Sequence, residues 1–118
     1  MRLTEVTYGS AKAIEGYGPG FFRVAGHVLR GPCLITPWDA GPWGGYDDTT
    51  APLSLVGQID VLFVGTGAGI AHVPKAFREA LEGQGVGVEV MASPTAARTY
   101  NVLLGEGRRV AVALLPVP

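Results

Sequence analysis

The sequence predicts a small α/β domain, on three observations. Its 118 residues fit one domain that buries roughly two thirds of the surface its unfolded chain would expose. Short β-prone runs separated by Gly and Pro fill the first half, while the second half alternates buried strand patterns with helix patterns. We therefore expect a single domain over residues 1–118, β-rich at first and then β-α-β-α-β.

In the first half, Gly-Pro and Pro-Gly steps separate three short runs that favour strands in hairpins. The runs are Phe21–Val24, His27–Arg30 and Cys33–Thr36. Residues 38–52 then form a long Gly, Pro and aromatic stretch, and a loop of about this length is usually functional or mobile. We expect "LSLVGQI", which follows it, to form a short helical turn.

The second half shows the usual signals for starting and stopping helices. Pro74 and Gly83 bound one helix, and the next has Ser93 as its cap, Pro94 at its first helical position and Gly105 at its end. The strands expected around these helices are Val61–Gly65, which is apolar throughout, then Val86–Met91, and the final "RVAVALLPV".

Composition and charge exclude several classes of function. Nine Lys and Arg against ten Asp and Glu leave no basic footprint for nucleic acid. The single Cys33 cannot form an internal disulfide and is expected to be a small buried hydrophobe. The stretch "MRLTEVTYGS" lacks a signal-peptide apolar run, and no run of about 18 apolar residues predicts a transmembrane segment. These features favour a cytoplasmic protein.

The "GTG" at Gly65, Thr66 and Gly67 resembles a phosphate loop but matches neither common motif. Gly69 is followed by Ile70 and not by the Lys of a Walker A loop. A dinucleotide fingerprint would need a third glycine where Ile70 stands. Two interpretations stay open: backbone amides that bind a small anion or polar ligand, and glycines that only permit a tight exit from the strand.

The candidate ligand site combines Gly65, Thr66 and Gly67 with Asp39 and the helix start at Ser93. No catalytic residue is assigned, because His27 and His72 are far apart and no nucleophile motif occurs. For the same reason we expect neither a metal nor a cofactor. A mid-strand carboxylate, Glu89, is expected to pair with Arg98 or Arg108, since burying it alone would cost several kcal/mol. A catalytic acid is the alternative interpretation of Glu89.

Trp38, Trp43 and Tyr46 supply the aromatic types that are enriched in binding hot spots. Ligands of α/β sheets bind at the carboxyl ends of strands, which is where Gly65 should lie. We therefore expect these aromatic residues and the "GTG" exit to share one edge of the domain and to form its working surface.

The strings "FVGTG", "VGVEVM" and "AARTYNVLLGEGRRVAVALLPV", together with "ITPWD", resemble the Mth-like domain family of unknown function. That family includes bacterial and archaeal stand-alone domains, an adipogenesis-associated protein and an assembly factor of mitochondrial respiratory complex I. The resemblance covers essentially the whole chain.

The resemblance implies a three-layer α/β fold around a mixed central sheet, with an additional β layer, and no established catalytic activity. It favours a domain that binds a protein partner during assembly of a respiratory complex. The alternative is a domain that binds a small molecule or anion, or an uncharacterised enzyme, with its pocket at the Gly65-Thr66-Gly67 exit. An enzyme needs an acid, base or nucleophile in contact range, whereas an adaptor needs only a complementary surface.

Overall fold

The computed structural model describes residues 11–118, so the amino-terminal stretch considered for a targeting signal lies outside the described residues. In chain order the elements are β1 (Ile14–Gly18), β2 (Phe21–Val24), β3 (His27–Arg30), β4 (Cys33–Ile35), β5 (Ala40–Pro42), the 3-10 helix η1 (Gly45–Asp47), α1 (Thr50–Leu53), β6 (Val61–Thr66), α2 (Lys75–Glu82), β7 (Gly87–Met91), α3 (Ser93–Gly105) and β8 (Val110–Leu115).

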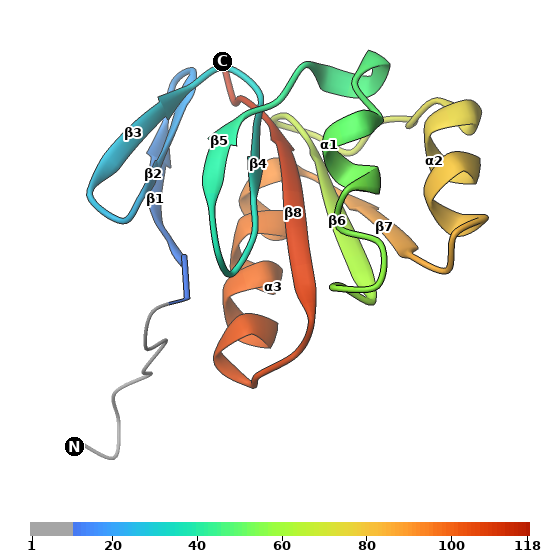
Figure 1. Cartoon of the computed structure of the whole chain (residues 1–118). Helices are drawn as coiled ribbons and strands as arrows, with labels where there is room; N and C mark the ends of the chain where they lie inside the picture. The colour runs from blue at the N-terminus through green and yellow to red at the C-terminus, as the bar shows by residue number, and fades with distance from the viewer. Residues whose placement is uncertain (1–10) are drawn as a thin grey trace.

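A mixed five-stranded sheet in the order β5-β4-β8-β6-β7 forms the centre of the domain (Figure 1). β6 is parallel to both β7 and β8, whereas β4 is antiparallel to β8 and to β5. The parallel part comes from the β-α-β-α-β half of the chain, as parallel strands require crossover connections. The hairpin of β4 and β5 extends the same sheet on the β8 side.

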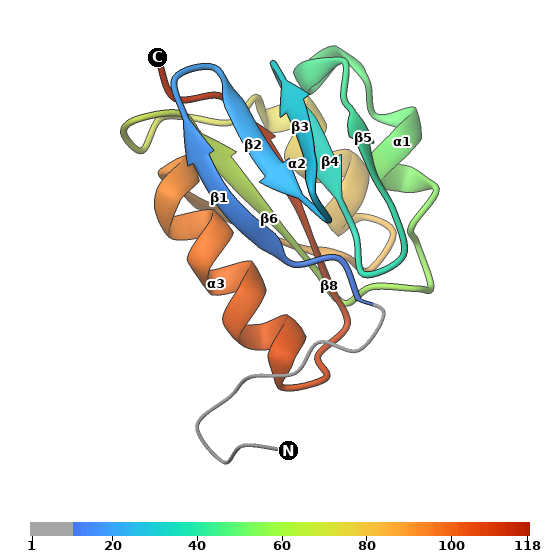
Figure 2. The same ribbon diagram turned by 90° about the vertical axis from the view of Figure 1, so that its left-hand side faces the viewer.

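Helices and a second sheet cover the two faces of the central sheet. One face carries α3 and the antiparallel sheet β1-β2-β3, and α2 lies behind the other face (Figure 2). Each face has its own apolar core. The first core includes Phe22, Phe63 and Tyr100, and the second includes Leu62 and Phe77.

β6 shows why the sheet is covered on both sides. Phe63 belongs to the core under α3, whereas Leu62 and Val64 on either side of it belong to the core under α2. Since successive side chains of a strand point to opposite faces, a strand with both faces buried must be apolar throughout. The prediction of a strand that is buried on both faces is therefore confirmed. The two predicted helices are also present, as α2 and α3, and the three-layer α/β fold class is confirmed.

Two predicted segments differ in detail. Residues 38–52 are not one irregular loop, because β5, η1 and the start of α1 lie within them. The helical turn expected over "LSLVGQI" comes earlier, as α1 ends at Leu53.

The expected pairing of Glu89 is wrong. Glu89 is exposed, and the ion pairs found among residues 11–118 do not include it. The reason is the place of β7 in the sheet. β7 is an edge strand of the described sheet, so a mid-strand carboxylate there reaches water without a partner.

Candidate functional site

The carboxyl end of β6 packs directly against the start of α3. A Cβ atom on Gly65 would lie 2.6 Å from Leu114 Cδ2, 2.7 Å from Ser93 Oγ and 2.8 Å from Ser93 Cα. At each of these distances something must move, and the contact with Ser93 Cα would require a shift of the α3 backbone. Gly65 is therefore required by the close approach of α3 to the strand.

Ser93 joins three elements at this point through its backbone and its hydroxyl. Its Oγ accepts a hydrogen bond from Gly67 N–H at 2.8 Å and donates one to Leu115 O at 2.6 Å. Its backbone N–H donates to Gly67 O at 2.8 Å. Ser93 is fully buried and makes no capping hydrogen bond, so the predicted helix-cap role is wrong.

Thr66 holds the loop that follows β6. Its Oγ1 donates to Gly69 O at 2.7 Å and accepts a hydrogen bond from Ala71 N–H at 3.0 Å. The structure thus brings together Gly65, Thr66 and Ser93 as predicted, along with Gly67, but it uses their polar groups within the chain. The Gly67 N–H that was expected to meet an anion is already bonded to Ser93.

Asp39 does not join this group. Gly65 lies level with Leu114, and Leu114 lies level with Cys33 on β4. From Cys33, β4 runs away from Gly65, and its turn into β5 lies at the opposite end of the sheet from the carboxyl end of β6 (Figure 1). Asp39 lies in this turn, beyond Ile35, so its level along the sheet is roughly 10 Å from that of Gly65. The proposed single working surface is therefore wrong for Asp39 and for its neighbour Trp38.

The two tryptophans have different environments. Trp38 is 54% exposed at the turn between β4 and β5, whereas Trp43 is only 4% exposed. Trp43 packs on Tyr46 and Phe77 with ring centroids 5.7 Å away in both cases, and its Nε1–H donates to Asp48 O. Trp43 is thus a core residue, and the expectation that it belongs to an interaction surface is wrong. Tyr46 is half-buried in the same aromatic cluster.

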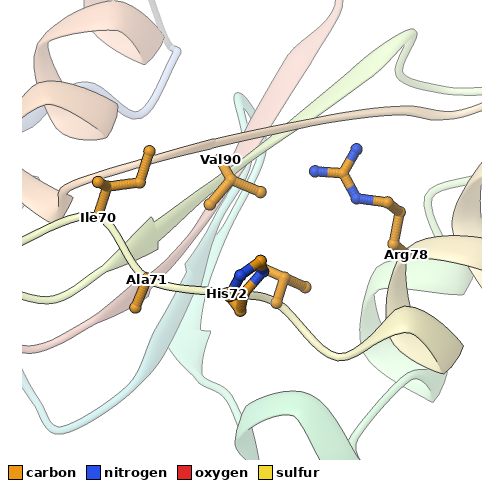
Figure 3. Close-up of a pocket in the computed structure, with 6 residues that line it drawn as sticks. Ile70, Ala71, His72, Arg78 and Val90 are labelled. Carbon is orange, nitrogen blue, oxygen red and sulfur yellow. The ribbon is translucent and has the colours of Figure 1, made fainter.

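A cleft of about 480 Å³ lies beside the Thr66 loop. It lies between that loop, α2 and β7, and its lining residues are Ile70, Ala71, His72, Val73, Arg78 and Val90. Ile70 and Arg78 flank Val90 from opposite sides (Figure 3). Ile70 is 72% exposed, and the Arg78 guanidinium lies 3.5 Å from the Glu82 carboxylate. The cleft is therefore largely apolar, with its nearest cation already paired.

Of the described side chains that line the cleft, two can carry a charge, His72 and Arg78. Among residues 11–118, no cluster of His, Cys, Asp and Glu has the geometry of a metal site. Cys33 is buried in the core, and burial raises the pKa of its thiol to about 12, which keeps it protonated and unreactive. Burial likewise raises the pKa of Tyr100.

Sequence reasoning missed the way in which α3 holds β1. The Asn101 side chain pairs with the backbone of Ile14, accepting from its N–H at 2.8 Å and donating to its O at 2.7 Å. Tyr100 OH donates to Lys12 O at 2.7 Å. These partners are 87 and 88 residues away in sequence, so no local pattern could have revealed them.

The comparisons with known proteins agree with this architecture. Residues 14–115 match the model of a family described as "Protein of unknown function (DUF498/DUF598)". The chain belongs to this family. Within the described residues, no helix has both the length and the hydropathy to span a membrane.

Two groups of relatives are informative. An uncharacterised protein of Rhodobacter capsulatus is 54% identical over 118 residues, covering 100% of this chain and 95% of the relative. NADH dehydrogenase (ubiquinone) 1 alpha subcomplex assembly factor 3 of Danio rerio is 36% identical, over 89% of this chain and 64% of that protein. The human factor of the same name is 31% identical, over 100% of this chain and 68% of its own length. The chain thus spans about two thirds of these assembly factors.

Solved structures confirm the Mth-like fold. A Bordetella pertussis protein described as a Mth938-like domain superposes with a TM-score of 0.77 at 27% identity, covering 98% of this chain and 92% of that one. A protein of Bartonella henselae, described as an outer membrane protein, superposes with a TM-score of 0.83 at 33% identity, over 92% of this chain and 98% of that one.

Proposed function

We propose that this chain is a non-catalytic assembly-factor domain that binds a protein partner while a respiratory NADH dehydrogenase is built. The observation that carries the proposal is the similarity of the chain to proteins named as assembly factors of NADH dehydrogenase, at 31–36% identity over most of its length. On this proposal the domain works in the cytoplasm.

The geometry of the site supports binding without chemistry. The polar groups at the exit of β6 are bonded to one another, and the thiol of Cys33 is buried in the core. The large apolar side chains exposed on the described surface include Ile70 at the cleft and Trp38 at the opposite end of the sheet. Large apolar side chains, Trp above all, can anchor a protein interface when a partner covers them.

Deletion of the gene in its source organism tests the proposal. Native electrophoresis with staining for NADH oxidation should show less of the full-size enzyme and an accumulation of smaller intermediates. The chain itself should restore assembly, and the 54% identical relative from Rhodobacter capsulatus serves as a cross-complementation control. A full-size enzyme at normal abundance and rate of appearance in the deletion strain would overturn the proposal.

A further inference from the structure

The most informative feature of the surface is the open edge of the central sheet at β7. β7 is the last strand in the order β5-β4-β8-β6-β7, and within the described residues its only strand partner is β6. An edge strand has a row of backbone N–H and C=O groups without partners, which can pair with a strand of another chain.

The direction of these groups follows from one hydrogen bond. Gly87 N–H donates to Asp60 O at 2.9 Å, so the groups of Gly87 point toward β6. Along a strand, the N–H and C=O of successive residues point to alternate sides. Those of Glu89 therefore also point to β6, and those of Val88 and Val90 point outward.

Val90 connects this edge to the cleft. Its outward backbone groups can pair with a new strand, while its side chain lines the cleft with Ile70 and Arg78 (Figure 3). A strand added beside β7 would place every second side chain on the cleft face. Such a side chain would cover Ile70, which is otherwise 72% exposed.

Glu89 defines the charge of the other face. Its carboxylate is exposed in mid-strand and pairs with no Lys or Arg of the described residues. Since opposite charges on directly facing residues stabilise a strand pair, the residue opposite Glu89 should be basic.

The same carboxylate disfavours a second copy of this chain. Antiparallel pairing of two β7 strands with full overlap would centre on Glu89, because it is the middle residue of Gly87–Met91. The two Glu89 side chains would then face each other directly, and like charges in that position destabilise the pair. A different protein with a basic residue there fits better.

We infer that β7 and the adjoining cleft bind an extended segment of the partner protein, which adds a strand to the central sheet, places an apolar side chain in the cleft and sets Lys or Arg opposite Glu89. This mode is β-augmentation, in which backbone hydrogen bonds give affinity and alternate side chains give specificity. The inference rests on the proposed function, because it assigns the surface that takes the partner.

The test uses a phage library of random twelve-residue peptides selected on the purified full chain. Selected peptides should alternate apolar residues with Lys or Arg. On titration with such a peptide, the backbone amides of Val88 and Val90 should shift most in NMR spectra.

Two substitutions then examine the geometry. Val90→Pro removes an outward N–H without breaking the ladder to β6, so it should weaken the peptides by about tenfold. Glu89→Lys should weaken them by about three- to tenfold, and peptides with Glu in place of Lys and Arg should recover that loss. Glu106→Lys, the same charge change at an exposed residue beyond α3, is the matched control and should leave affinity unchanged.

Circular dichroism checks that each variant is folded. If Val90→Pro does not fold, the charge exchange at Glu89 tests the inference on its own. The inference is overturned if no peptide is enriched, if enriched peptides bind both variants as they bind the native chain, or if they bind the cleft without shifting the Val88 and Val90 amides. These results leave the proposed assembly role standing, since gene deletion tests that role independently.

Discussion

Gly65→Ala tests the packing that forms the candidate site. The added methyl group would meet Ser93 Cα at 2.8 Å, Ser93 Oγ at 2.7 Å and Leu114 Cδ2 at 2.6 Å. Leu114 can change rotamer only within a filled core, and the Cα atom belongs to the backbone of α3. Overpacking of this kind costs about 1–3 kcal/mol.

A second contribution comes from hydrogen bonds. A shift of Ser93 lengthens its bonds to Gly67 and Leu115, each worth about 1 kcal/mol. We therefore expect Gly65→Ala to lower the free energy of unfolding by about 3 kcal/mol, a large fraction of the 5–15 kcal/mol typical of a domain.

The assay is urea unfolding followed by far-UV circular dichroism, with Gly69→Ala as the control. Gly69 lies four residues further along the chain, in the loop after β6, but a Cβ there meets nothing within 4 Å. The control should change stability by less than about 1 kcal/mol. Equal stability of the two variants, at equal denaturant slopes, would refute the argument that Gly65 is needed for close packing.

Three further predictions concern buried side chains. Burial raises the pKa of Cys33 from 9.0 to about 12, so a thiol reagent should label Cys33 only in urea. Between pH 9.0 and about 12 only the unfolded thiol ionises, and the free energy of unfolding should therefore fall as pH rises. This fall should be smaller in Cys33→Ala. Tyr100→Phe removes the hydrogen bond to Lys12 O and should lower the free energy of unfolding in urea by about 1–2 kcal/mol. Because burial raises the pKa of Tyr100, the native chain should lose stability above pH 10, and the variant should lack this contribution. Trp43→Ala should cost about 3–5 kcal/mol, whereas Trp38→Ala should change stability by less than about 1 kcal/mol; similar losses for both would contradict their different burial.

The parts of the fold that the sequence predicted are those with local signals. The apolar run at β6 and the Pro and Gly residues that bound α2 act within a few residues, so they can be read from the chain. β5 has no such signal. Its three residues, Ala40–Pro42, form a strand only because β4 pairs with them.

The site was harder to predict, because its contacts are distant in sequence. The hydroxyl of Ser93 bonds to Gly67 and Leu115, 26 and 22 residues away, and not to the helix that it begins. Trp43 stands in a Gly and Pro stretch that favours exposure, yet it completes a core with Phe77. Only tertiary packing decides whether such an aromatic residue is buried in the core or exposed to a partner protein.

The environment of Glu89 depends on strand order. A strand in mid-sheet would have buried this carboxylate, whereas β7 at the edge leaves it in water. The order of strands is not encoded in the local sequence of any one of them. A buried Glu89 would have needed a partner, but the position of β7 at the edge of the sheet removes that need.

The most direct measurement of the central claim is quantitative mass spectrometry of proteins captured with the tagged full chain while NADH dehydrogenase is being synthesised. The account predicts enrichment of subunits of that enzyme in incomplete complexes, and their loss with Glu89→Lys but not with Glu106→Lys. The account would be contradicted if the native chain captured no subunit of the enzyme. Recovery of the fully assembled enzyme in the same amount as the incomplete complexes would also contradict it.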